Sequence, residues 1–77
     1  MNEEAKLIEG CLAWKRKAQS ELYQRFAPRL YGICLRYASG RAEAEDLLQE
    51  GFIKIFSSLQ SYSGTGSFEG WMRRIIV

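Results

Sequence analysis

A helical apolar period across residues 22–37 constrains the fold most strongly. The spacing keeps to about 3.6 residues throughout, at Leu22, Phe26, Leu30, Ile33, Cys34 and Tyr37. Nowhere does the chain alternate apolar and polar residues with the period of two that is typical of strands. Because a helix with one apolar stripe must bury that stripe against another element, the pattern predicts an all-α fold, a compact bundle.

Four segments carry this pattern, and we expect three main helices and a short C-terminal one, at about 3–13, 16–38, 41–60 and 67–77. Pro28 interrupts hydrogen bonding in the second, so we expect a single kinked helix, and Gly40 is expected to end it. Ser67 is a suitable N-cap for the fourth helix, with Glu69 in its first turn. The apolar pattern reaches Val77 without a stop signal, so we expect residues 1–77 to be one domain cut from a longer protein.

Composition excludes several classes of protein. Hydrophobic residues make up 47% of the 77 residues and charged residues 26%, which is ordinary for a globular domain. No apolar run approaches the roughly 18 residues that span a membrane. The N-terminus is acidic and polar, unlike a signal peptide, so we expect a cytoplasmic protein without membrane insertion.

The two cysteines do not predict a metal site. Cys11 and Cys34 fall at apolar helical positions, and the chain has no His. Because a zinc site needs about four N or S ligands, two thiols cannot complete one. We therefore expect reduced core thiols, no metal and no cofactor.

The third segment has two faces. Its core face carries Leu48, Phe52 and Ile55, and roughly opposite lie Asp46, Gln49, Glu50 and Ile53 at i, i+3, i+4 and i+7. An acidic face with an apolar end suits the docking of a basic helix, although a merely solvated face has the same pattern. Glu43, Asp46 and Glu50 could also gather a magnesium ion, but without His or a sign of a cleft we do not expect an enzyme, and no residue is assigned as catalytic.

Three stretches together resemble region 2 of bacterial sigma factors, and most of all their extracytoplasmic-function (group IV) branch. They are ELYQRFAPRLYGICLRYA, AEDLLQEGFIKIF and, after a short loop, SFEGWMRRIIV. The resemblance runs from about Leu7 to Val77, and the DNA-binding region 4 of the family is absent. It implies a domain that binds core RNA polymerase through the beta-prime coiled coil, recognises the minus-ten promoter element and helps to open the strands. An anti-sigma factor is a further possible partner.

The resemblance also assigns residues to the polymerase. Asp46, Gln49 and Glu50 match positions that face the beta-prime coiled coil, and Leu47 and Ile53 would be apolar neighbours. This assignment agrees with the two-faced helix read from the residues.

The resemblance places a pocket for one flipped non-template base in the loop at about 60–66. Gly64 and Gly66 allow positive φ and close backbone approach, and hydroxyls or amides can read a base edge. The expected DNA-binding set is Ser61, Tyr62, Ser63, Gly64, Thr65, Gly66, Ser67, Trp71, Arg73 and Arg74, with Arg36, Arg41 and Lys54 as possible extensions.

The aromatic residues at the edge of the loop leave alternatives open. Tyr62 either lines the pocket or closes the core beneath it. Phe68 is expected in the core, and Trp71 either in the core or on DNA. Housekeeping sigma factors have a second Trp where this chain has Met72, which implies weaker intrinsic melting. The alternative function is a helical protein-interaction module that does not bind DNA.

Overall fold

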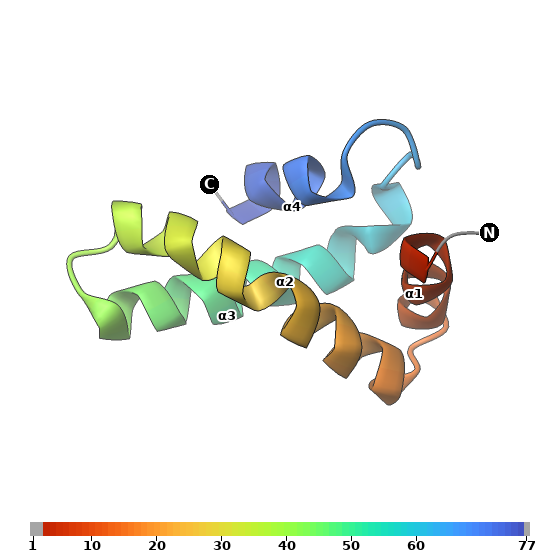
Figure 1. Cartoon of the computed structure of the whole chain (residues 1–77), viewed down its shortest axis with the longest axis horizontal. Coiled ribbons are helices and arrows are strands. Elements are labelled where there is room, and N and C mark those ends of the chain that lie inside the picture. The colour runs from red at the N-terminus through yellow and green to blue at the C-terminus, as the bar shows by residue number, and fades with distance from the viewer. Residues whose placement is uncertain (1–2, 77) are drawn as a thin grey trace.

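The computed structural model describes residues 3–76, which form helices and connecting loops without any strand. The order is α1 (Glu3–Leu12), α2 (Arg16–Tyr37), α3 (Arg41–Ser58), a 3-10 turn η1 (Leu59–Ser61) and α4 (Phe68–Ile76). The molecule measures 39 × 25 × 19 Å, with α2 and α3 along its length and α1 at one end (Figure 1). The all-α prediction is confirmed, and the part of the fourth helix expected at Val77 lies outside the described residues.

The third helix is shorter than predicted. It ends at Ser58, and η1 takes the place of its expected last turn. Serine side chains bind carbonyls at this end: the Ser57 hydroxyl donates to the Ile53 carbonyl at 2.8 Å, and the Ser61 hydroxyl to that of Ser58 at 2.6 Å. Such side-chain bonds compete with helical ones, which gives a local reason for the early end. Leu59 is nevertheless buried, so the core stripe continues into the turn.

The second helix continues through Pro28, as predicted, and bends along its length in Figure 1. Its end differs from the prediction. The Ala38 amide donates to the Cys34 carbonyl at 2.9 Å, and the helix stops at Tyr37, before Gly40. Gly40 instead precedes α3, where its carbonyl accepts the Ala44 amide at 3.0 Å. The expectation that Gly40 ends the second helix was therefore wrong, because this residue begins the third.

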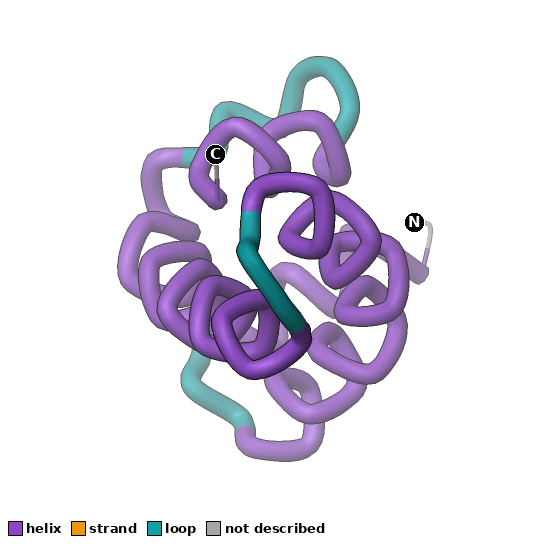
Figure 2. The backbone as a smooth tube through the Cα atoms, turned by 90° about the vertical axis from the view of Figure 1, so that its left-hand side faces the viewer, coloured by secondary structure: helices purple, strands orange, loops and turns teal. Residues whose placement is uncertain are grey.

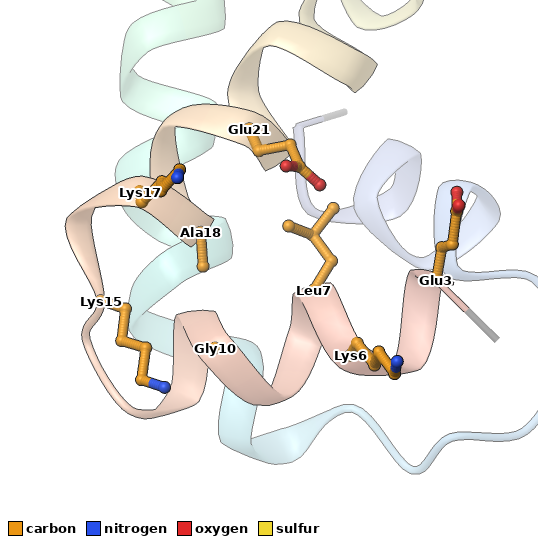
Figure 3. Close-up of a pocket in the computed structure, with 8 residues that line it drawn as sticks. All are labelled: Glu3, Lys6, Leu7, Gly10, Lys15, Lys17, Ala18 and Glu21. Carbon is orange, nitrogen blue, oxygen red and sulfur yellow. The ribbon is translucent and has the colours of Figure 1, made fainter. Parts of the chain in front are cut away.

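A tight turn joins α1 to α2. The Trp14 amide donates to the Cys11 carbonyl at 3.0 Å, and the Lys15 amide to that of Gly10 at 3.1 Å, which is the Schellman pattern of a helix end. Trp14 has the left-handed φ of 59° that this pattern needs. The helices approach closely here, since a Cβ on Gly10 would lie 2.7 Å from the Ala18 Cβ, and Figure 3 shows Ala18 pointing toward Gly10.

One hydrophobic core joins all four α-helices. Figure 2, viewed from one end of the long axis, shows the helices arranged around a common interior. The predicted stripes are confirmed at buried residues that include Leu7, Cys11, Leu22, Phe26, Leu30, Cys34, Leu48, Phe52, Ile55, Phe68 and Met72. Ala44 is also buried, although no stripe predicted it. Tyr37 is an exception, because it is 66% exposed at the end of α2.

The cysteine side chains behave as core residues. Cys11 and Cys34 are free and buried, as predicted. Burial raises the pKa of both thiols, and the Glu21 carboxylate adds to the effect at Cys11. Both side chains are therefore held in the neutral thiol form. Among the helices of residues 3–76, none combines the length and the apolar character that a membrane crossing requires.

Candidate functional site

The loop between η1 and α4 stands out from the helices at one end of the molecule (Figures 1 and 2). It spans residues 62–67, so the first two residues of the predicted loop belong to η1 instead. Gly64 and Gly66 have φ values of 81° and 75°. Both lie in the left-handed region, as the sequence predicted, and this region strongly favours glycine.

Short polar bonds hold the loop in shape. The Tyr62 hydroxyl donates to the Gly66 carbonyl at 3.1 Å, and the hydroxyls of Ser63 and Thr65 lie 2.8 Å apart. The Thr65 amide points to the Ser63 Oγ at 3.4 Å. By contrast, the amides of Ser63, Gly64 and Gly66 donate to no acceptor among residues 3–76. The loop thus offers three exposed amide donors on a folded backbone.

An aromatic cluster supports this loop from beneath. It consists of Phe26, Tyr62, Phe68 and Trp71. Phe68 is 1% exposed, and its ring centroid lies 5.6 Å from Phe26, 5.1 Å from Tyr62 and 5.8 Å from Trp71, where the rings stack. Tyr62 and Trp71 are 5.3 Å apart. The expectation that Phe68 belongs to the core is confirmed.

The same cluster shows where Tyr62 and Trp71 lie, the two aromatic residues for which the sequence left two roles open. Tyr62 is half-buried: its ring closes the core beneath the loop, and its hydroxyl holds Gly66. Trp71 is also half-buried, so one part of its ring packs on Phe68 while another part meets solvent. Contact with the core and contact with a ligand are therefore compatible at Trp71.

Two interactions fix the start of α4 just after the loop. The Ser67 Oγ accepts the Gly70 amide at 3.0 Å, and the Ser67 carbonyl accepts the Trp71 amide at 3.0 Å, which confirms the predicted N-cap. Glu69 then pairs with Arg29 of α2 at 2.7 Å. This ion pair, between residues forty positions apart, carries no signal in a single sequence. It ties the end of the loop to α2.

The outer face of α3 consists of Asp46, Gln49, Glu50 and Ile53. All four are exposed, and Ile53 is 66% exposed. Neither acidic residue takes part in the ion pairs of the described chain, Arg25–Glu3 and Arg29–Glu69. Leu47 lies differently: it is half-buried, packs on the core and lines a small cavity of about 160 Å³ with Cys34, Tyr37 and Ile76. Of the five residues predicted to contact the polymerase, the structure thus places four together on one exposed face. Leu47 lies beside them, partly buried in the core.

The magnesium alternative finds no support. No three His, Cys, Asp or Glu side chains gather into a possible metal site anywhere in residues 3–76. Glu43, one of the three carboxylates considered, accepts a hydrogen bond from the Ser39 hydroxyl at 2.7 Å. Its contact is therefore local, at the start of α3.

Basic side chains gather at the far end of α4. Arg73 and Arg74 lie in its last turn and line a groove together with Ile33, Arg36 and Tyr37 of α2. Of the extensions considered from the sequence, Arg36 joins this groove, whereas Arg41 and Lys54 of α3 do not line it. The sequence predicted Arg73 and Arg74 as DNA-binding residues and Arg36 as an extension, but their convergence in one groove depends on the packing of α4 against α2.

A second opening lies between α1 and α2 (Figure 3). It has a volume of about 460 Å³. Three lysines, Lys6, Lys15 and Lys17, share its lining with Glu3 and Glu21. Because charges of both signs surround it, this opening selects neither an anion nor a cation.

These helices, loop and surfaces coincide with a known family. The sequence model described as Sigma-70 region 2 matches residues 22–77, which cover α2 from Leu22 onward, α3, the loop and α4. The chain belongs to this family. The family is not one of enzymes, which agrees with the expectation from the sequence.

Curated relatives show which branch of the sigma-factor family this chain resembles. The chain is 46% identical over 55 residues to the "ECF RNA polymerase sigma factor SigE" of Mycolicibacterium smegmatis, an alignment covering 71% of this chain and 21% of that protein. It is 35% identical over 71 residues to the "ECF RNA polymerase sigma-E factor" of Haemophilus influenzae, covering 92% and 37%. It is 27% identical over 75 residues to the "RNA polymerase sigma-H factor" of Pseudomonas aeruginosa, covering 97% and 39%. The resemblance to extracytoplasmic-function sigma factors is thus confirmed, and the chain spans about two fifths or less of these relatives.

Proposed function

We propose that this sigma region 2 domain recognises the minus-ten promoter element by capturing one extruded base of the non-template strand in the 62–67 loop. The observation that carries the proposal is the loop itself. Three amides of exposed residues, at Ser63, Gly64 and Gly66, have no acceptor within residues 3–76 and stand beside the hydroxyls of Ser63 and Thr65. Such groups can read the edge of a base once the base has left the duplex.

The energy of base capture limits what the loop can do alone. Losing one stacking step costs about 1.4 kcal/mol, and stacking one base on an aromatic ring returns roughly 1–3 kcal/mol. The half-buried ring of Trp71 is the available stacking surface beside the loop. One such contact offsets about one lost step, so opening a promoter also requires backbone contacts and the polymerase. Met72 cannot act as a second stacking surface, because methionine has no ring and its side chain is fully buried in the core.

The proposal assigns the outer face of α3 to the polymerase. Asp46 and Glu50 are exposed and form no ion pair with any residue in 3–76, and Ile53 adds an apolar surface beside them. A basic helix of the beta-prime coiled coil would place Arg or Lys against these carboxylates. Because Leu47 is half-buried, only the exposed part of its side chain can contact the polymerase. An anti-sigma factor that covered this face would compete with the polymerase. Both interactions would take place in the cytoplasm, where polymerase and promoter meet.

Binding of a beta-prime coiled-coil fragment tests the polymerase face. Asp46→Ala and Glu50→Ala should each weaken the complex in a titration, because each removes a carboxylate that faces the partner. Glu45→Ala is the matched control, since Glu45 is an exposed acid of the same helix outside the outer face. Unchanged binding by both test variants, or an equal loss for Glu45→Ala, would remove this assignment.

Selection from a pool of random single-stranded oligonucleotides tests base capture. The intact chain should enrich a short motif. A variant with Gly64 and Gly66 both replaced by Ala should lose that motif, because Ala does not readily keep their positive φ. A protein-interaction module would instead bind all sequences equally and only through salt-dependent attraction. Absence of an enriched motif for the intact chain would therefore favour the alternative function.

A further inference from the structure

The turn between α1 and α2 exposes apolar and basic side chains together. Every residue from 12 to 17 is exposed, with Leu12 at 40% and Trp14 at 66%. Three consecutive cations follow the tryptophan, namely Lys15, Arg16 and Lys17. We call residues 12–17 the basic turn. Because it contains no acid, its formal charge is greater than the net charge of +2 of the whole chain.

The rest of the described chain leaves these side chains unpaired. The ion pairs of residues 3–76 are Arg25–Glu3 and Arg29–Glu69, and neither includes a residue of the basic turn. Glu21 follows Lys17 by one helical turn, but no ion pair joins the two. The ring contacts of residues 3–76 also leave out Trp14. The basic turn therefore presents its charges and its indole ring to solvent.

The residue types of the basic turn work against the local fold. Trp14 has the left-handed φ of 59° that suits glycine. Lys15 stands at the N-cap of α2 without a side-chain cap bond, where Ser, Thr, Asp or Asn would supply one. Arg16 and Lys17 begin α2, where the helix dipole favours acids. Residues that oppose their local structure in this way are expected at functional surfaces.

The basic turn lies apart from the surfaces proposed for DNA. Figures 1 and 2 both place the α1–α2 connection at the opposite edge of the molecule from the 62–67 loop. The arginine groove lies at the other end of α2, because Arg36 follows Arg16 by twenty residues of helix, about 30 Å. A strand held by the loop and the groove would therefore not cover the basic turn.

The composition of the basic turn fits a lipid surface better than a nucleic acid. Tryptophan rings favour the boundary between membrane and water, and lysine and arginine are attracted to anionic headgroups. Leu12 adds an aliphatic group, which has no ring face for a base. Two of the three cations are lysines, which lack the fork that binds a phosphate in a bidentate way. A turn at the edge of the molecule can also meet a flat surface without a pocket.

We propose that the basic turn binds the surface of an anionic lipid membrane. Trp14 and Leu12 lie at the level of the headgroups, and Lys15, Arg16 and Lys17 contact the anionic lipids around them. The contact is peripheral and requires no segment that crosses the membrane. Each cation near such a surface raises partitioning about fivefold, so the three together favour anionic over neutral lipid roughly a hundredfold. The proposal goes beyond promoter recognition and does not depend on it.

Vesicle flotation of the whole chain tests the charges, with Lys15→Gln compared against Arg41→Gln. Both variants remove one exposed positive charge, and Arg41 begins α3 at the opposite end of the molecule (Figure 1). The vesicles contain phosphatidylcholine alone or mixed with phosphatidylglycerol, at about 0.1 M salt, where the Debye length is about 10 Å. Lys15→Gln should reduce partitioning into the mixed vesicles about fivefold, and Arg41→Gln should leave it unchanged. Equal partitioning of the two variants, or no preference of the wild type for the mixed vesicles, would overturn the proposal.

Tryptophan fluorescence tests whether the ring of Trp14 enters the headgroup region. Trp71→Phe leaves Trp14 as the single tryptophan and keeps a ring in the aromatic cluster. The emission should shift to shorter wavelength when the mixed vesicles are added, and an unshifted emission from bound protein would contradict the proposal. Trp14→Gly should weaken partitioning without loss of folded stability, because glycine suits the left-handed φ. Partitioning of Trp14→Gly equal to that of the wild type would also overturn the role of the ring.

Labelled random-sequence DNA separates a lipid surface from a nucleic-acid site. Lys15→Gln and Trp14→Gly should bind this DNA as the wild type does at the same salt concentration. A loss of DNA affinity as large as the loss of lipid partitioning would assign the basic turn to nucleic acid and overturn the proposal. Failure of base capture is read separately, because it appears as a missing sequence motif and leaves vesicle partitioning unaffected.

Discussion

At the scale of single residues, Trp14 combines a bulky side chain with a backbone conformation that suits glycine. It is the single non-glycine residue with positive φ in residues 3–76, and its side chain is 66% exposed. The Schellman turn requires this φ, whereas the exposed ring contributes little burial in return. The sequence offered no hint of this, because Trp is a rare choice for a left-handed position.

We predict that Trp14→Gly stabilises the domain. Relief of the left-handed conformation is worth about 1–2 kcal/mol, less the extra freedom that glycine has in the unfolded chain. Urea denaturation of both proteins measures the difference. Trp14→Ala keeps the strained φ and serves as the control. A less stable Trp14→Gly would show that the ring makes a contribution that its exposure does not reveal.

The buried thiols give a prediction about pH. Burial raises the pKa of Cys34 and of Cys11 above the ordinary value of 9.0, so the folded state keeps its thiol protons to higher pH than the unfolded state does. Their contribution to stability is therefore complete below about pH 9 and is lost as the pH rises through the raised values.

Denaturation at pH 8 and at pH 10 measures this effect. The free energy of unfolding should drop more between these pH values in the wild type than in Cys34→Ala, which keeps only one of the two buried thiols, Cys11. The comparison uses the decrease in unfolding free energy between pH 8 and pH 10 for each protein. It does not use the absolute stabilities, because Cys34→Ala also leaves a small cavity. Equal drops would contradict the role of the buried thiol.

At the scale of the elements, the contact between α3 and α4 depends on a glycine. A Cβ on Gly51 would lie 2.5 Å from the Ile76 Cγ1, so any larger residue must displace the Ile76 side chain or the end of α4. The sequence placed Gly51 in the third helix but gave no reason for it. The close approach of α4 to α3 supplies that reason.

A pair of glycine substitutions tests this contact. Gly51→Ala should destabilise the domain, because overpacking costs about 1–3 kcal/mol, which exceeds or cancels the gain of about 1 kcal/mol from removing a helical glycine. Gly32→Ala should show only the gain, since nothing lies within 4 Å of its Cβ. Thermal or urea denaturation of both variants measures the change in stability. Similar stabilisation by both would mean that α4 does not approach α3 this closely.

The elements also show what a single sequence can predict. Helical periods located all four helices, because apolar spacing directly reflects which side of a helix is buried. Local hydrogen bonding at Ser57 and Ser61 changed the end of α3, and Gly40 was assigned to the wrong helix. For the candidate site, the sequence predicted the positive φ of Gly64 and Gly66 and the cap at Ser67. The Arg29–Glu69 pair and the arginine groove depend on helix packing, which no local pattern encodes.

At the scale of the whole molecule, the proposed DNA and polymerase surfaces belong to different elements. The loop is held by Tyr62, Ser67 and the Arg29–Glu69 pair, whereas the outer face of α3 projects its side chains from a helix anchored by Leu48, Phe52 and Ile55. No hydrogen bond or ion pair of residues 3–76 joins the loop to Asp46 or Glu50. The two kinds of binding should therefore be separable by mutation.

Assembly of a three-part complex tests this central claim most directly. The beta-prime coiled-coil fragment is immobilised and the chain is added. Retention of both the chain and its selected oligonucleotide is then measured for wild type, Glu50→Ala and the double variant with Gly64→Ala and Gly66→Ala. We predict that Glu50→Ala reduces retention of the chain while its affinity for the oligonucleotide in solution stays the same. The double loop variant should be retained fully but should no longer hold the selected oligonucleotide more tightly than an unrelated sequence. The account would be contradicted if a folded variant of either type lost both kinds of binding. It would also be contradicted if neither variant lost any binding.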